Sequence, residues 1–243
     1  MPELVYPPVI SLVKSAWKYL GLDFTIIGES HIPRTGPAIM AINHVSYLDF
    51  AIAGTAALPS RRLVRFMAKK EIFDHPIAGP LMRGMKHIPV DRANGAPSYT
   101  KALRALAQGE IIGIFPEATI SRSFELKEMK NGVVRLAMDS GAPVLPTILW
   151  GSQRIWSKKM ARDFSRAGYP ITISIGEPLY FTPGEGIDDA MARLKEVMSE
   201  RLERAITDYP DSPIGQRWAP ARIGGTAPSQ AMIDAEKKAR KEI

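Results

Sequence analysis

The sequence predicts an α/β fold with a mixed, largely parallel sheet that is flanked by helices. Short apolar runs rich in β-branched residues alternate along the chain with longer segments of helical periodicity, and this alternation is typical of βαβ units. The chain has 243 residues, of which 45% are hydrophobic. That is enough to bury the core of one domain of this kind.

Each element of this domain is predicted from a local pattern. Apolar runs such as IIGIF and ITISI place strands at residues 23–28, 37–42, 63–68, 87–90, 111–115, 143–149 and 171–175. Apolar residues recurring every three or four positions place helices at 47–58, 75–84, 97–108, 127–140 and 187–207. Ser46 and Asp49 have the spacing of a capping box, which would start the first of these helices at Tyr47.

The two ends of the chain lie outside this domain, which spans residues 23–209. At residues 1–22 we expect an amphipathic helix with a stripe that includes Leu12, Trp17 and Leu20, and with Lys14 and Lys18 on the other side. Such a helix can lie in a membrane interface, but the same stripe can also pack on the protein's own core. Residues 210–243 are rich in Pro, Gly and polar residues and are expected to form a peripheral tail.

Charge and composition narrow the classes of function. The formal charge of +7 favours an anionic partner, which is a phosphorylated substrate, an anionic membrane surface or nucleic acid. The absence of cysteine excludes a disulfide scaffold, a thiolate zinc site and a cysteine nucleophile. We expect no metal site, because the four histidines lack zinc-type spacing, and no nucleic-acid partner, because no such signature is present.

The segment AINHVSYLDF carries the first candidate site. His44 and Asp49 lie where a predicted strand gives way to a predicted helix. They are either a general base with its orienting carboxylate or a polar turn residue followed by a helix cap.

Two further strands end in polar residues. The strand in GMKHIPVDR delivers Arg92, and the strand in IIGIFPEATISRS delivers Glu117, Thr119 and Arg122. In open α/β sheets ligands gather at the carboxyl ends of the strands. We therefore expect these side chains to converge near His44.

The ordered set of motifs resembles the glycerolipid acyltransferase family over residues 15–205. Asn43, His44 and Asp49 match its first motif and residues 88–92 its second. The third motif, Phe-Pro-Glu-Gly-Thr-Arg-Ser, is matched by Phe115, Pro116, Glu117 and Thr119 but is interrupted at Ala118 and Ile120. Residues 144–148 match the fourth, and the segment FMAKKEIF, which contains Lys69, is also similar to the family.

The resemblance implies a glycerol-3-phosphate acyltransferase-like fold for an acyltransferase domain at residues 23–209, and an enzyme that needs no cofactor. It would move a fatty acyl group from an acyl thioester, acyl-CoA or acyl carrier protein, to a hydroxyl of a lysophospholipid such as 1-acylglycerol-3-phosphate. His44 would be the general base, oriented by Asp49, with no covalent enzyme intermediate. Acceptor-binding residues would be Arg92, Glu117, Thr119, Arg122 and Lys69, and Arg122, Lys127 or Lys130 can replace the arginine missing at Ile120.

Alternatives stay open at this point. The acceptor can be another lysophospholipid or a larger phosphoinositol glycolipid, whose headgroup would suit the basic segment with Trp150, Arg154 and Trp156. A non-catalytic lipid- or nucleic-acid-binding protein is the alternative of another class. No apolar run reaches the roughly 20 residues that span a bilayer. We therefore expect a cytoplasmic, monotopic protein on the inner leaflet, attracted by basic residues that include Lys14, Lys18, Arg61, Arg62 and Arg65.

Overall fold

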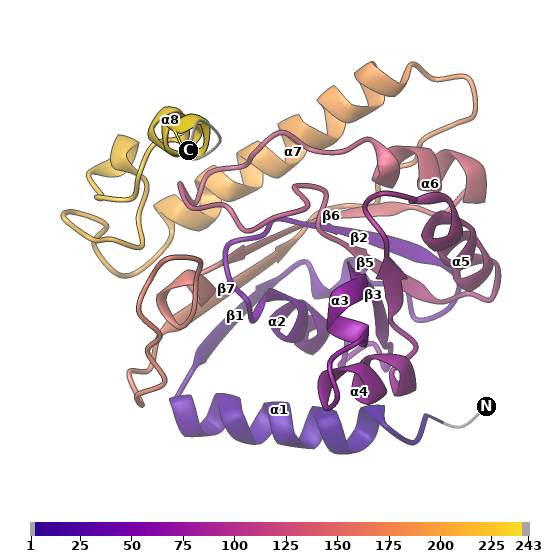
Figure 1. Ribbon diagram of the computed structural model, residues 1–243, viewed down its shortest axis with the longest axis horizontal. Coiled ribbons are helices and arrows are strands. Elements are labelled where there is room, and N and C mark those ends of the chain that lie inside the picture. The colour runs from indigo at the N-terminus through magenta and orange to yellow at the C-terminus, as the bar shows by residue number, and fades with distance from the viewer. Residues whose placement is uncertain (1–2, 240–243) are drawn as a thin grey trace.

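The computed structural model describes residues 3–239 and contains one seven-stranded sheet with the strand order β1-β7-β6-β2-β5-β3-β4 (Figure 1). Strands β6, β2, β5, β3 and β4 are parallel to one another, whereas β7 pairs antiparallel with β6 and parallel with β1. The strand bounds are β1 (Asp23–Ile27), β2 (Ala38–Ile42), β3 (Val64–Lys69), β4 (Ile88–Val90), β5 (Ile111–Ile114), β6 (Val144–Trp150) and β7 (Pro170–Ile175). The predicted fold class is confirmed.

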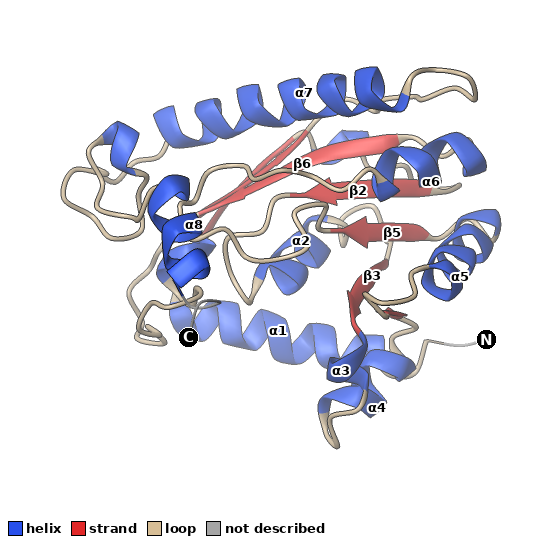
Figure 2. Ribbon diagram, turned by 45° about the horizontal axis from the view of Figure 1, so that its top comes forward, coloured by secondary structure: helices blue, strands red, loops and turns tan. Residues whose placement is uncertain are grey.

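Helices cover both faces of the sheet (Figures 1 and 2). On one face lie α1 (Tyr6–Leu20) and α2 (Asp49–Ala56), and on the other lie α5 (Ala96–Ala107), α6 (Gly132–Ser140) and α7 (Ile187–Thr207). The short helices α3 (Lys70–Phe73) and α4 (Ala78–Gly84) follow β3, and α8 (Gln230–Ala239) belongs to the C-terminal segment. Single 3-10 turns are η1 (Glu29–His31), η2 (Ser152–Arg154) and η3 (Ala221–Ile223).

Strand β2 shows why the sheet has two cores. Its residues are fully buried, with Ile39 and Ala41 in the core under α5–α7 and Met40 and Ile42 in the core under α1 and α2. A strand buried on both faces needs apolar residues at every position. This is why the run AIMAI is continuous rather than alternating.

Three predicted helices begin later in the structure than expected. Helix α2 begins at Asp49 rather than Tyr47, whose N–H donates to the Trp156 carbonyl. Helix α6 begins at Gly132 rather than residue 127, because the N–H groups of Lys127 and Lys130 donate to Glu117 and Pro116. The helix expected at 75–84 begins only at Ala78, and a separate turn, α3, precedes it.

Helix α1 is partly a core element. Trp17 and Leu20 are buried in the core under α1 and α2, and the indole N–H of Trp17 donates to Thr55 Oγ1 at 3.1 Å. Of the two placements left open for this stripe, packing on the core is confirmed for Trp17 and Leu20, and contact with a membrane is wrong for them. Leu12 and Tyr19 lie on the outer side of the same helix and are 68% and 67% exposed.

Two of the basic residues expected to attract lipids instead form ion pairs or hydrogen bonds within the protein. Arg65 is buried and pairs with Glu3 and Glu110. Arg62 donates to backbone carbonyls at residues 33, 36 and 109. Lys14, Lys18 and Arg61 are exposed.

The segment after Tyr209 packs more closely on the domain than its composition predicted. Trp218 is buried against Trp150 and Tyr209, and Ala219 and Ile233 are also buried. Between residues 3 and 239, no helix is both long and apolar enough to cross a membrane.

Candidate active site

The His44 and Asp49 side chains meet at the carboxyl end of β2. His44 lies in the irregular turn between β2 and α2, and its Nδ1 is 2.9 Å from Asp49 Oδ2. A carboxylate can only accept, so Nδ1 carries the proton and the lone pair is on Nε2. No hydrogen bond within residues 3–239 reaches Nε2, and the His44 side chain is 21% exposed.

Asp49 is completely buried, and donors surround its carboxylate. Oδ2 also accepts the N–H groups of Val45 at 2.7 Å and Ser46 at 2.8 Å, while Oδ1 accepts the hydroxyl of Ser152 at 2.7 Å. These bonds stabilise the charged carboxylate in a buried position. One carboxylate therefore ties the turn before α2 and orients the imidazole, and the role of His44 as a general base stays a prediction.

The third motif supports His44 from the other side. The centroid of the His44 ring lies 4.4 Å from that of the Phe115 ring. The backbone N–H of His44 donates to Glu117 Oε1 at 2.9 Å, and its backbone carbonyl accepts the Ser121 N–H at 2.7 Å. The loop after β5 thus fixes the backbone of the residue that the turn after β2 presents.

Glu117 is a buried carboxyl group with an unusual pKa. Burial raises its pKa to about 7, against the opposing effects of the hydrogen bond from His44 and the charge of Lys127. Glu117 faces the His44 backbone rather than solvent. Its role in binding the acceptor stays a prediction.

Ala118 is one of the two departures from the family's third motif. Its φ is 59°, in the left-handed region that favours glycine, the residue that the family has here. The Ala118 carbonyl accepts a hydrogen bond from Arg92 Nη2 at 2.6 Å. The strained turn is therefore held by the arginine of the second motif.

The predicted acceptor residues fall on two sides of this loop. Arg92 and Lys69 are both exposed, and Lys69 pairs with Glu71 at 2.9 Å. Thr119 and Arg122 instead line a separate pocket. The structure therefore does not gather these residues into one cluster.

The second departure from the family motif, Ile120, lies at the pocket that Thr119 and Arg122 also line. Ile120, at the position of the family's arginine, is almost fully buried and lines this pocket, as do Arg122 and Lys127. The Lys127 ammonium donates to the carbonyl and hydroxyl oxygens of Thr119. Arg122 and Lys127 thus lie around the same pocket as Ile120, and their replacement of the missing arginine stays a prediction.

Several residues that build the site were not predicted. Ser152 and Ser157 brace the turn through Asp49 and the Val45 carbonyl. They lie more than 100 positions along the chain from their partners, so no local pattern signals them. Asn43, although part of the motif, is buried and bridges β2 to the backbone of Leu149 through both side-chain atoms.

In the segment that could suit a bulky headgroup, the aromatic and basic side chains mostly contact other residues of the protein. Trp150 is fully buried, and Arg154 pairs with Asp211 and lies over the rings of Tyr169 and Trp218. Trp156 packs on Tyr47. The alternative in which Trp150 and Arg154 contact a headgroup is therefore wrong, because both side chains pack against other residues of the protein.

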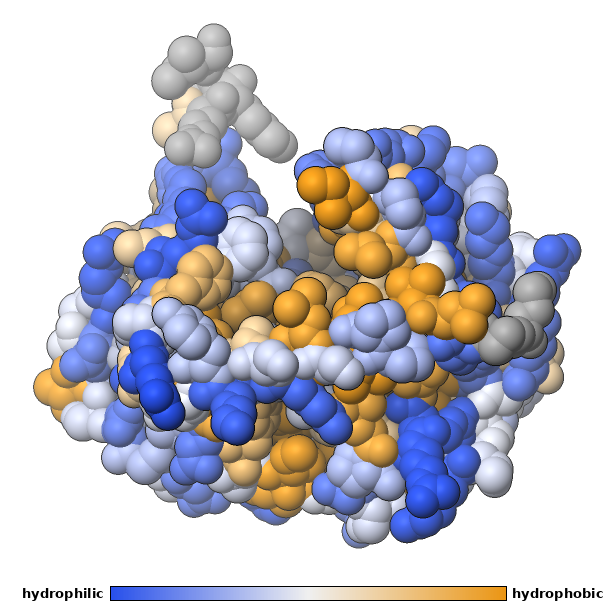
Figure 3. All heavy atoms as spheres, turned by 90° about the horizontal axis from the view of Figure 1, so that it is seen from below, coloured by the Kyte–Doolittle hydropathy of each residue, from blue (hydrophilic) through white to orange (hydrophobic). Residues whose placement is uncertain are grey.

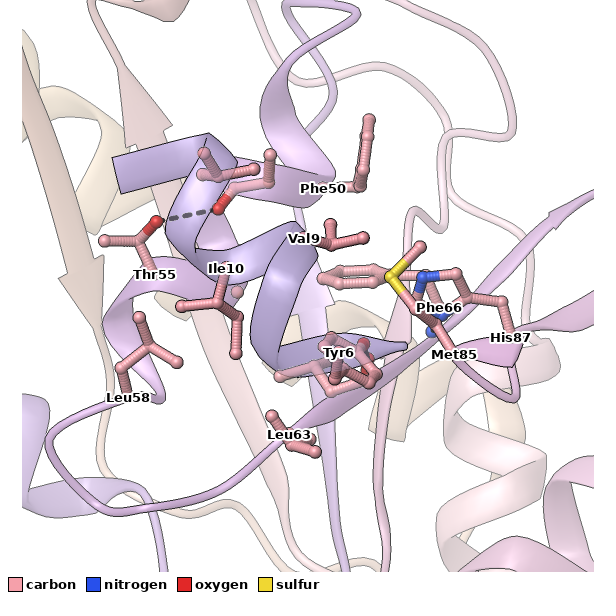
Figure 4. Close-up of a pocket in the computed structure, with 14 residues that line it drawn as sticks. Tyr6, Val9, Ile10, Phe50, Thr55, Leu58, Leu63, Phe66, Met85 and His87 are labelled. Atoms are coloured by element: carbon pink, nitrogen blue, oxygen red, sulfur yellow. Dashed lines mark hydrogen bonds between the residues drawn. The ribbon is translucent and has the colours of Figure 1, made fainter. Parts of the chain in front are cut away.

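A second pocket is apolar, and one of its lining residues, Phe66, contacts Phe115. It lies between α1, α2 and β3, and Figure 4 shows side chains including Val9, Phe50 and Phe66 pointing into it. Phe66 stacks on Phe115, which in turn contacts His44. The imidazole is thus joined to a hydrophobic pocket through two aromatic rings.

Known proteins are similar to this chain in sequence. The family model of the acyltransferases matches residues 23–150. The 1-acyl-sn-glycerol-3-phosphate acyltransferase of Bacillus subtilis is 28% identical over 181 residues, which cover 73% of this chain and 85% of that protein. The enzyme of the same name from Limnanthes douglasii is 33% identical over 193 residues, which cover 76% of this chain and 65% of that protein.

The fold is also found in a solved structure. The 1-acyl-sn-glycerophosphate (LPA) acyltransferase PlsC from Thermotoga maritima superposes with a TM-score of 0.69 at 21% identity, covering 84% of this chain and 80% of that one. The family match spans more than half of the chain and includes His44, Asp49, Arg92 and Glu117. The chain therefore belongs to the glycerolipid acyltransferase family and is an acyltransferase.

Proposed function

We propose that this acyltransferase acts in phospholipid biosynthesis and moves a fatty acyl group from an acyl thioester to the free hydroxyl of a lysophospholipid such as 1-acylglycerol-3-phosphate. The observation that carries the proposal is the orientation of His44, whose Nδ1 is held by Asp49 and whose Nε2 is unoccupied by residues 3–239. The two relatives from Bacillus subtilis and Limnanthes douglasii are named for this reaction.

In the proposed mechanism His44 Nε2 removes the proton of the acceptor hydroxyl as its oxygen attacks the thioester carbonyl. Asp49 stabilises the imidazolium that forms. The tetrahedral intermediate then collapses, the C–S bond breaks, and the proton on Nε2 passes to the departing thiolate. A thioester is already activated, so no enzyme nucleophile is needed, which agrees with a chain that has no cysteine.

The apolar pocket is the proposed site of the acyl chain. Its walls include Val9, Phe50 and Phe66, and the Phe66–Phe115 pair connects it to His44. A chain lying there would keep its carboxyl end near the imidazole. The acceptor's phosphate would lie across the 117–119 loop, in contact with Arg92 or with the cations that line the other pocket.

We further propose that the protein works as a monotopic enzyme on the cytoplasmic leaflet. Hydrophobic residues gather around a hollow on the face that carries α1 (Figure 3). The exposed side chains of α1, α3 and α4 include Leu12, Tyr19, Ile72 and Leu81, and Ile77, directly before α4, is exposed as well. Lys14 and Lys18 flank them on α1, a combination suited to an anionic lipid surface.

A panel of acceptors tests the proposed reaction. Labelled acyl-CoA and labelled acyl carrier protein are each offered with 1-acylglycerol-3-phosphate, other lysophospholipids and a phosphoinositol glycolipid. We expect labelled product with a lysophospholipid acceptor and none from a variant with His44→Gln. Product only with the glycolipid would select the alternative acceptor, and no product with any pair would contradict the proposal.

A further inference from the structure

The pocket beside the third motif is strongly cationic. Five cationic side chains line it: Arg122, Lys127, Lys158, Lys159 and Lys237. Only Lys237 comes from α8, and the others come from two loops. The carboxylate of Glu236, also on α8, lines the same pocket.

Glu236 places its charge between the pocket's cations. Its Oε2 is 2.6 Å from Arg122 Nη1, and its Oε1 accepts a hydrogen bond from Lys159. The hydrogen bonds from Lys159 and Arg122 lower the pKa of the Glu236 carboxyl to about 2. The carboxylate is therefore ionised at any physiological pH.

Helix α8 is held to the domain by few interactions. Among its ten residues, Ile233 is the buried one, and most of the others are exposed. A Pro- and Gly-containing segment joins it to α7, and it lies outside the part that matches the family model. Ion pairs with partly exposed partners are individually weak, so an incoming anion can compete with Glu236.

A phosphate monoester is a stronger ligand for these cations than a carboxylate. It carries a charge of about −1.5 to −2 and three acceptor oxygens, and a guanidinium such as that of Arg122 can bind two of them at once. The pocket adjoins Thr119 in the loop that supports His44. An anion bound there would be close to the reacting groups.

We propose that α8 is a lid over this pocket and that Glu236 is a built-in competitor, which the phosphate monoester of the acceptor headgroup displaces from Arg122 and Lys159. This inference rests on the proposed function for the identity of the acceptor. Displacement of Glu236 releases the lid, so that phosphate binding and the opening of α8 are coupled.

The test compares Glu236→Gln with a matched control, Glu185→Gln. Both changes remove one paired carboxylate, but Glu185 pairs with Arg193 at 2.8 Å and does not line the pocket. Binding of inorganic phosphate and of glycerol 3-phosphate is measured by calorimetry without an acyl donor. We expect Glu236→Gln to bind both about three- to tenfold more tightly than the unaltered protein, and Glu185→Gln to bind them unchanged.

Hydrogen exchange distinguishes displacement from closure. In the unaltered protein, glycerol 3-phosphate should speed amide exchange in residues 230–239, and Glu236→Gln should show fast exchange without it. Slower exchange with the ligand, or weaker binding by Glu236→Gln, would mean that α8 closes over the phosphate and would overturn the proposal.

Turnover identifies the source of the phosphate. Glu236→Gln should lower KM for 1-acylglycerol-3-phosphate by about the same factor as it tightens binding, with little change in KM for the donor. Tighter binding of inorganic phosphate with an unchanged acceptor KM would make this a site for free phosphate and would refute the acceptor assignment. Absence of all acyl transfer would count against the proposed function, while the binding measurements still decide the role of Glu236.

Discussion

The Asp49 carboxylate has two separable tasks at the scale of single residues. In Asp49→Asn the amide oxygen can take the place of Oδ2 and keep the backbone N–H bonds, and the Ser152 hydroxyl can turn to accept from the amide nitrogen. The amide cannot stabilise an imidazolium, so we expect kcat to fall by about 10²–10⁴-fold with a much smaller change in Tm.

Ser152→Ala is the matched control for this experiment. It removes the partner of Oδ1 but leaves the contact between His44 and Asp49. We expect its kcat to fall far less than that of Asp49→Asn. Equal losses of kcat in both variants, accompanied by unfolding, would assign Asp49 a purely structural task.

Two buried groups give the stability of the fold an unusual dependence on pH. Burial raises the pKa of Glu117 from 4.5 to about 7, so the stabilisation linked to its proton is present below pH 4.5 and is lost as the pH rises through 7. Burial, and then the charge of Arg65, lowers the pKa of His87 from 6.5 to about 4. The contribution of His87 therefore has the opposite sign, and it is lost as the pH falls from 6.5 to 4.

Single substitutions should separate the two contributions. The free energy of unfolding of the unaltered protein minus that of Glu117→Gln should decrease between about pH 4.5 and 7 and then level off. The same difference for His87→Gln should increase between about pH 4 and 6.5. Urea unfolding across this range measures both, and a difference independent of pH would show that the group titrates normally.

Ala118 is expected to cost stability. A left-handed conformation costs a residue with a Cβ roughly 1–2 kcal/mol, of which glycine's greater entropy in the unfolded chain offsets about half. Ala118→Gly should therefore raise the free energy of unfolding by roughly 0.5–1 kcal/mol. The control Ala96→Gly, at the helical start of α5, should lower it or leave it unchanged.

At the scale of elements, helix α1 has one side in the core and another on the outer surface. Leu12→Ser/Tyr19→Ser should weaken sedimentation with anionic vesicles and leave Tm nearly unchanged, because both side chains are exposed. Trp17→Ala should instead cost about 3–5 kcal/mol of stability, because the indole is buried and bonded to Thr55. Full sedimentation of the double variant would place the membrane contact elsewhere.

The elements that were predictable from the sequence are those whose patterns are local. Helix α7 was predicted with its observed bounds, and each strand was predicted to within one residue, because runs such as ITISI and the periodicity of 187–207 reflect burial directly. The His44–Asp49 pair was predictable because both residues belong to one turn. Helix α3 was not predicted, and α4 was expected to begin at residue 75 rather than at Ala78, since the apolar pattern does not record where a backbone N–H finds its partner.

Contacts between distant segments account for the rest. Ser152 reaches Asp49 across 103 positions, and Glu236 reaches Arg122 across 114. Neither pairing leaves a periodic signal. The same reason explains why a headgroup contact by Trp150 and Arg154 stayed open as an alternative, because an aromatic and basic composition does not distinguish an interior cluster from a binding surface.

The order of the strands has a consequence for the whole molecule during its synthesis. Strand β1, near the start of the chain, pairs with β7, and Asp23 lies opposite Pro170. Pairing across so many residues carries a high loop-closure entropy and is slow. While the ribosome still holds the residues of β7, β1 has no neighbour, and the apolar side of α1 lacks part of the core that later covers it. A nascent chain released before residue 170 should therefore bind hydrophobic probes and chaperones through its first helix more strongly than the 243-residue chain does.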